Sequence, residues 1–287
     1  MSGELTIDQI TTHFEDVEIL REIEGGANKQ VYEAKYQGQT IAFKILPIDN
    51  RRAEGYAKRE IETMQKIDSP ILVDLLGHTA TEIDGTYVFA LLEEFVPGNT
   101  LKGVLEENGG DPDLGLDVTR SLLSVLPAFD EDEIIHRDIK PGNIMVRPDG
   151  EITLLDVGIA RMQNRTSLTP TFAPHGPGTY AYSAPEQLNN EKEIQGCRTD
   201  LFATGIVMFE SITGEHPFAP DDIDITIPDA ILQEERKELN GYLEDPDFEA
   251  ELNEFFKKMT SFEPYERFRK AEFARQEFND ITGDAHV

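Results

Sequence analysis

The most constraining feature of the sequence is the segment IIHRDIKPGNIMVRPDGEITLLDVG at residues 134–158, in which charged residues lie between two apolar runs. Asp149-Gly150 predicts a two-residue hairpin turn, because both residues tolerate positive φ. Strand partners lie equally far from such a turn, which places Asn143 opposite Asp156. Two oxygen ligands side by side suit a hard cation such as magnesium, whereas a plain hairpin with polar ends is the alternative.

Length and composition indicate a soluble globular protein. The 287 residues suffice for one large or two smaller domains, and 39% of them are hydrophobic. No run approaches the roughly 20 apolar residues of a membrane span, and the acidic start has no signal-peptide core, so we expect a cytoplasmic protein. The single cysteine, Cys197, excludes an internal disulfide and a Cys-based zinc site.

The charge balance argues against polyanionic partners. The formal net charge is −30, and both the part up to Phe95 and the remainder contain about twice as many acidic as basic residues. There is no basic stripe to neutralise nucleic-acid phosphates or anionic lipid. We therefore expect neither nucleic acid nor membrane as a partner.

The first third of the chain favours an antiparallel sheet. VEILREIE, KQVYEAKYQ and QTIAFKILP are short runs rich in β-forming residues, separated by glycine-containing turns. Asp84-Gly85 predicts a further hairpin, and the VPGN segment after it is a plausible joint between two lobes.

Helical spacing appears between these strands and again in the second part. RRAEGYAKREIETMQKID, residues 51–68, places apolar residues at intervals of three and four, and Glu60 lies beside that stripe, where a carboxylate needs a partner. LFATGIVMFESITG is apolar nearly all round, which is typical of a helix buried at a domain centre. The irregular stretch between Asp156 and Glu186 is long enough to indicate a functional or disordered segment.

Together these motifs resemble, in family order from about residue 17 to about 270, a eukaryotic-type (Hanks-type) serine/threonine protein kinase domain. HRDIKPGN resembles the catalytic loop and DVG the metal-binding triplet. APE resembles the end of the activation segment, and IAFK the strand with the phosphate-binding lysine. TDLFATGIVMFESITGEHPF resembles the central helix that begins at a buried aspartate, here Asp200, and Arg267 stands where the family places the ion-pair partner of Glu186.

The resemblance implies an α+β, bilobal protein kinase-like fold. A small antiparallel β-sheet N-lobe with one helix would precede a larger, mainly helical C-lobe. We expect an N-terminal extension at 1–16, a kinase domain at 17–275 and a C-terminal tail at 276–287. Within the domain, the N-lobe would span 17–95, the hinge 94–98 and the C-lobe 99–275.

The family's mechanism implies a role for each matching residue. Lys44 would contact the α- and β-phosphates of ATP and be oriented by Glu60, while Asn143 and Asp156 would hold Mg²⁺. Asp138 would accept the proton of the attacking hydroxyl, and Lys140 would stabilise the transferring phosphate as in serine/threonine kinases. The expected ATP-binding residues are Gly26, Lys29, Val31, Ala42, Lys44, Glu94, Val96, Asn143 and Asp156.

Some positions depart from the family pattern. The phosphate loop reads EGGANKQV, so Gly26 alone matches a family glycine, while Glu24 and Lys29 fill the other two positions. Lys29 could still offer a cation to a phosphate. Glu93 occupies a position behind the adenine that is commonly apolar, and Glu94 and Val96 would then present the hinge backbone groups to the adenine edge.

Three functions follow from the resemblance. An active kinase would phosphorylate Ser or Thr of protein substrates and itself, the latter at Thr166, Ser167, Thr169 or Thr171. A pseudokinase that acts as an ATP-binding scaffold is the alternative suggested by the altered phosphate loop. A small-molecule phosphotransferase is disfavoured, because such enzymes usually have HGD in place of HRD and lack the APE segment.

Overall fold

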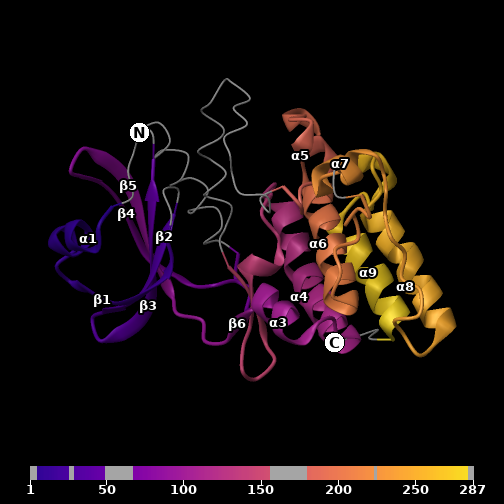
Figure 1. Ribbon diagram of the computed structural model, residues 1–287, viewed down its shortest axis with the longest axis horizontal. Coiled ribbons are helices and arrows are strands. Elements are labelled where there is room, and N and C mark those ends of the chain that lie inside the picture. Colours follow the sequence, from indigo (N-terminus) through magenta and orange to yellow (C-terminus); the bar gives the residue numbers. More distant parts are fainter. Residues whose placement is uncertain (1–4, 26–28, 49–66, 156–179, 223–224, 284–287) are drawn as a thin grey trace. The chain divides into compact units, whose positions relative to one another are not determined.

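The computed structural model describes residues 5–25, 29–48, 67–155, 180–222 and 225–283 (Figure 1). The described residues divide into two compact units, the first ending at Pro97 and the second beginning at Gly98. This boundary falls inside the VPGN segment that was predicted to join two lobes. Residues 51–66 of the helix expected over residues 51–68 lie outside the described residues, and Ile67 and Asp68 are not helical.

An antiparallel sheet forms the first unit, with strand order β1-β2-β3-β5-β4. Its described elements are α1 (Ile7–His13), β1 (Val17–Glu24), β2 (Gln30–Tyr36), β3 (Gln39–Pro47), β4 (Leu75–Ile83) and β5 (Thr86–Glu94). The predicted hairpin at Asp84-Gly85 is confirmed, since both residues have the positive φ, 47° and 84°, that a type I′ turn requires. The expected meander of β1, β2 and β3 is also confirmed.

One face of this sheet carries an apolar core that the N-terminal segment covers. Leu5 and Ile10 are buried in the same cluster as Tyr32, Ile41 and Phe43. The buried Gln30 side chain bonds the Leu5 backbone twice, accepting from its N–H at 3.2 Å and donating to its carbonyl at 2.8 Å. Residues from Leu5 onward, which were expected to form an extension, are therefore part of the first unit.

The second unit is mainly helical, with a small three-stranded sheet in the order β6-β7-β8. Its longer described helices are α3 (Leu101–Asn108), α4 (Pro112–Glu131), α6 (Cys197–Thr213), α8 (Pro246–Met259) and α9 (Ala271–Thr282). Its short described elements are β6 (Asn99–Thr100), β7 (Ile144–Val146), β8 (Ile152–Leu154), α5 (Pro185–Leu188), α7 (Ile227–Leu232) and the 3₁₀ turns η1 (Pro141–Asn143), η3 (Lys192–Ile194) and η4 (Pro264–Glu266).

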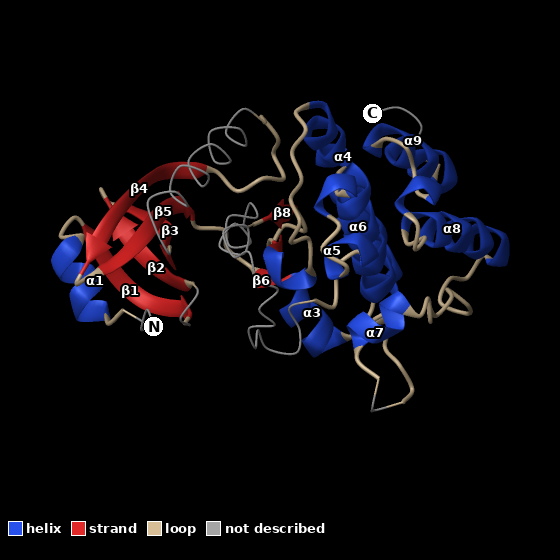
Figure 2. Ribbon diagram, turned by 90° about the horizontal axis from the view of Figure 1, so that it is seen from above, coloured by secondary structure: helices blue, strands red, loops and turns tan. Residues whose placement is uncertain are grey.

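Helix α6 lies at the centre of this unit, packed against α4, α8 and α9 (Figure 2). The prediction of a buried helix is confirmed, because the residues from Thr199 to Phe209 are all buried. Close packing also explains Gly205, where an added Cβ would lie 2.7 Å from a methyl of Thr260. The domain boundary expected after residue 275 falls inside α9, whose Phe278 is fully buried.

The predicted two-residue turn between β7 and β8 is wrong. Arg147 N–H donates to Glu151 O at 2.8 Å and Gly150 N–H donates to Arg147 O at 2.9 Å, so three residues close the hairpin. Pro148 favours a type I turn, and Gly150, at φ 89°, supplies the left-handed residue that follows such a turn. The register is displaced by one residue, which pairs Ile144 with Leu154 and brings Asn143 opposite Leu155 rather than Asp156.

Within the described ranges, no helix has the length and apolar character that crossing a membrane requires.

Candidate active site

The catalytic-loop residues predicted from the sequence gather around Asp138. Lys140 Nζ lies 2.9 Å from Asp138 Oδ2, and the Asn143 amide donates to the same oxygen at 2.8 Å. The amide also donates to the Asp138 main-chain carbonyl at 2.9 Å. These contacts fix the direction of a half-buried carboxylate, as a group that accepts a proton from a substrate requires.

The first turn of helix α6 binds the loop that carries Asp138. The buried carboxylate of Asp200 accepts from the main-chain N–H groups of His136 and Arg137, both at 2.8 Å. Arg137 has φ 65°, an unfavourable conformation for a residue with a side chain, and the bond to Asp200 compensates for it. The loop that carries Asp138 is thus attached to the most buried helix of the unit.

The orientation of Asn143 suits an oxygen ligand for a cation. Because its amide nitrogen is used by Asp138, its amide oxygen is the atom able to bind a metal ion. The second expected ligand, Asp156, lies outside the described residues. The described residues contain no cluster of three or more His, Cys, Asp or Glu side chains that could hold a metal.

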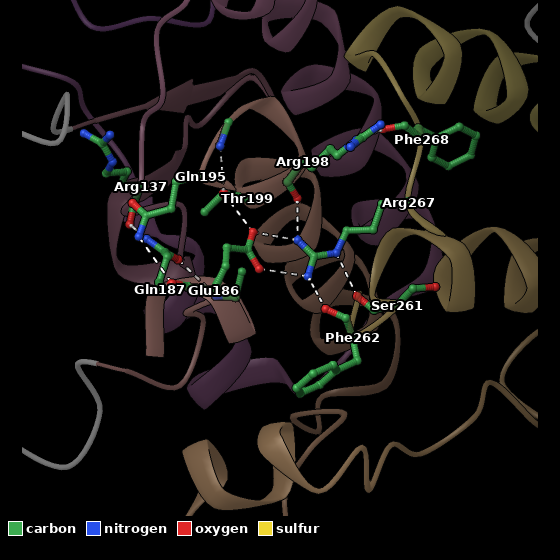
Figure 3. A network of polar contacts seen from close by, with 12 residues as sticks. Arg137, Glu186, Gln187, Gln195, Arg198, Thr199, Ser261, Phe262, Arg267 and Phe268 are labelled. Carbon is green, nitrogen blue, oxygen red and sulfur yellow. Dashed lines mark hydrogen bonds and ion pairs between the residues drawn. The ribbon is translucent and has the colours of Figure 1, made fainter. Parts of the chain in front are cut away.

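The ion pair expected between Glu186 and Arg267 is confirmed and is fully buried (Figure 3). Arg267 Nη1 and Nη2 bond the two carboxylate oxygens at 2.8 and 3.0 Å, which makes the pair bidentate. The guanidinium also donates to the carbonyls of Ser261, Phe262 and Arg198, and Thr199 donates to Glu186 at 2.8 Å. This network ties α5 to α6 and to the loop before α9.

A second buried cluster supports the segment just before α5. The Tyr182 hydroxyl donates to Glu210 on α6 at 2.6 Å, and burial raises the pKa of both groups. His216 accepts from Phe218 N–H through Nδ1 at 3.2 Å, which makes Nε2 the donor to Ala181 O at 3.0 Å. Burial lowers the pKa of His216 to about 4, so the ring is neutral at pH 7.

In the first unit, three residues expected to bind ATP share one face of the sheet. Val31 lies opposite Lys44, and Ala42 is two residues before Lys44 on the same strand. Because side chains alternate along a strand, all three point to the face away from α1 and its core. Lys44, only 4% exposed, forms an ion pair there with Glu93.

The two residues that replace family glycines in the phosphate loop pair with one another. Lys29 Nζ lies 2.9 Å from Glu24 Oε2, across the gap between β1 and β2. Gly26 lies outside the described residues. At the other end of the expected nucleotide site, Glu94 N–H donates to Asp74 O at 2.8 Å and Val96 is buried.

The sequence did not predict that Glu93 is a partner of Lys44. Glu60, the carboxylate expected to orient Lys44, lies outside the described residues, whereas Glu93 on β5 contacts Lys44 directly. Strands β3 and β5 are neighbours without being consecutive in the chain, so their register cannot be read from a turn. The available signal was a glutamate that follows Phe89 and Leu91 at every second position of the strand, a pattern that demands a buried partner.

Comparison with known proteins shows similarity over nearly the whole chain. The family model described as "Protein kinase domain" matches residues 17–279. The serine/threonine-protein kinase PrkC of Bacillus subtilis is 30% identical over 261 residues, which is 89% of this chain and 39% of PrkC. The probable serine/threonine-protein kinase PknB of Bifidobacterium longum is 32% identical over 195 residues, covering 64% of this chain and 28% of PknB.

A third relative, the serine/threonine-protein kinase PknD of Mycobacterium tuberculosis, is 28% identical over 224 residues, which is 76% of this chain and 32% of PknD. The chain thus spans between 28% and 39% of the length of these three relatives.

Proposed function

Because this chain belongs to the protein kinase family, we propose that it transfers the γ-phosphate of ATP to Ser and Thr hydroxyls of protein substrates. The observation that carries this proposal is the arrangement of Asp138, Lys140 and Asn143, which are joined by contacts of 2.8 to 2.9 Å. PrkC is named a serine/threonine-protein kinase and PknB a probable one, which supports the choice of acceptor.

Phosphoryl transfer asks the protein mainly for positioning and for neutralisation of charge. Asp138 accepts the proton of the attacking hydroxyl as the bond to phosphorus forms. Lys140, already paired with Asp138, meets the negative charge of the transferring group on its way to the acceptor. Both side chains come from one short loop, so their relative positions are set locally.

The nucleotide would lie against the face of the first unit's sheet that carries Val31, Ala42 and Lys44. Lys44 bonds the α- and β-phosphates, while Val31 and Ala42 cover the base. The main-chain N–H of Glu94 is used by Asp74, so Glu94 offers its carbonyl to the adenine amine and Val96 its N–H. Gly26 and Lys29 line the phosphate side in this proposal.

A divalent cation, Mg²⁺, would be held by the amide oxygen of Asn143 together with Asp156. When bound, the ion neutralises charge on the phosphate oxygens and orients the triphosphate. The chain's own contribution is to aim the Asn143 oxygen by engaging its amide nitrogen with Asp138.

Regulation by phosphorylation follows from the same proposal. Thr166, Ser167, Thr169 and Thr171 are the expected acceptors and lie outside the described residues. Arg137, which directly precedes the catalytic aspartate, would pair with the added phosphate. Mass spectrometry after incubation with ATP identifies the modified residues, and full activity with all four changed to Ala would remove the idea.

The scaffold alternative rests on the altered phosphate loop, where Glu24 and Lys29 form an ion pair. Incubation with γ-labelled ATP, Mg²⁺ and a mixed protein substrate separates the two functions. A kinase labels the substrate, and hydrolysis of the product yields phosphoserine or phosphothreonine. A protein that binds ATP but labels neither itself nor the substrate acts as a scaffold.

A further inference from the structure

Two adjacent strands of the first unit hold a buried ion pair that no family expectation assigned. The Lys44 ammonium on β3 donates to Oε2 of Glu93 on β5. The two residues are 4% and 5% exposed. Water therefore does little to screen the attraction between these charges.

The backbone ladder fixes this pair in place. Ala42 lies directly opposite Glu93, and Lys44 is two residues further along β3, so Lys44 and Glu93 are diagonal neighbours on one face. Diagonal positions in an antiparallel sheet are about 7 to 8 Å apart, a distance that two long side chains span. The strand register therefore brings the two side chains within reach of each other.

An ion pair at this position is costly compared with apolar packing. Removing two charges from water carries a penalty, and well-packed apolar residues of similar size are often at least as stabilising. Lys44 lies opposite Leu91. Phe89 and Leu91 precede Glu93 on the same face of β5. Sheet stability is thus not what a carboxylate at position 93 provides.

Resting on the proposed kinase function, we propose that Glu93 is a positioning residue that fixes the Lys44 ammonium where it meets the phosphates of ATP. An ammonium has three N–H donors, and the bond to Glu93 uses one of them. One ammonium can therefore donate to a carboxylate and to a phosphate oxygen at the same time. Glu93 lies on a strand, so it holds the lysine before the nucleotide arrives and reduces the ordering that binding requires.

Steady-state kinetics of two variants test this role. In Glu93→Leu the ammonium loses its strand-borne partner, and we expect kcat/KM for ATP to fall about 10- to 100-fold, with kcat contributing most of the loss. In Glu93→Gln the amide oxygen still accepts from Lys44, and we expect a smaller loss than in Glu93→Leu. Glu82→Leu makes the same change at an exposed position of β4 and serves as the control.

Two kinetic results would overturn the positioning role. Wild-type kcat and KM in Glu93→Leu would show that the pair has no part in the reaction. Higher activity in Glu93→Leu would show that Glu93 withholds Lys44 from the phosphates instead of presenting it.

A thermal-unfolding cycle tests the pair without any phosphate transfer. Lys44→Met and Glu93→Leu each remove one charge of the buried pair and leave the other charge without this partner, whereas the double variant removes both charges. We expect the double variant to melt at a higher temperature than either single variant, and strictly additive losses would overturn the pairing. If wild type transfers no phosphate, the proposed function fails, and this cycle alone decides whether Glu93 fixes Lys44.

Discussion

At the scale of single residues, the buried pair of Arg267 and Glu186 connects several segments of the second unit. Each guanidinium donor of Arg267 has an acceptor, and both side chains are 0% exposed. Arg267→Lys cannot reproduce the bidentate fork, and Glu186→Gln leaves the guanidinium without its counter-charge. We expect either variant to lose about 3 to 5 kcal/mol of unfolding free energy in urea titrations.

Lys237→Met is the matched control for this prediction, because it removes the exposed pair with Glu215. Its loss should be far smaller. Equal losses in the buried and the exposed variants would contradict the importance of the bidentate pair.

His216 predicts a specific pH dependence of stability. Burial lowers its pKa to about 4, whereas the unfolded chain binds the proton near pH 6.5. The neutral ring therefore contributes stability that is fully present above pH 6.5 and is lost as the pH falls toward 4, by up to about 3 kcal/mol. Protonation at Nδ1 would also remove the acceptor that Phe218 N–H uses.

Urea titrations of wild type and His216→Gln between pH 7.5 and pH 5 measure this loss. The neighbouring Glu210 has a raised pKa and shifts stability in the opposite direction, but it titrates in both proteins. The slope attributable to His216 is the difference between the two curves. Parallel curves would show that the ring does not titrate as described.

At the scale of elements, α1 is an unexpected part of the first unit's core. Ile10 is fully buried in the apolar cluster beneath the helix, whereas Ile7 on the same helix is 44% exposed. Ile10→Ala should reduce the unfolding free energy by about 2 to 4 kcal/mol, and Ile7→Ala by less than about 0.5. Denaturant unfolding of the two variants gives both values. Equal losses of unfolding free energy would show that α1 does not pack against the sheet through Ile10.

Several elements could be predicted from the sequence alone. The turns at Gln37-Gly38 and Asp84-Gly85 contain residues that accept positive φ, so local chemistry determined these hairpins. Helix α6 was predictable because its residues are apolar on every side. The Glu186–Arg267 pair was also predictable, although only through the family resemblance, since 81 residues separate the two.

Other features could not be predicted, because they depend on competing turn types or on contacts between segments that are distant in the sequence. Pro148 favours a type I turn over the type I′ turn that Asp149-Gly150 suggested, and this shifts the β7–β8 register by one residue. The contact of Glu93 with Lys44 requires the register of two strands that are not consecutive in the chain. The segment that contains Leu5 and Ile10 was expected to be an extension, because its apolar residues are too few to predict that it packs on the sheet.

At the scale of the whole molecule, the charge of −30 should control stability. Both the part up to Phe95 and the remainder are acidic, so like-charge repulsion opposes the compact state. Added KCl screens this repulsion over a Debye length of about 10 Å at 0.1 M. We expect the melting temperature to rise between 0.05 and 1 M KCl, on the order of several degrees, and a flat or falling curve would contradict this expectation.

We infer that Asp138 acts on the incoming hydroxyl while the nucleotide is held by other groups. The most direct test compares wild type with Asp138→Asn, using calorimetric titration with Mg-ATP beside a γ-phosphate transfer assay. We expect similar ATP affinities in the two proteins, and transfer slowed by about 100-fold or more in the variant. Full transfer by Asp138→Asn, or ATP binding without any transfer by wild type, would contradict it.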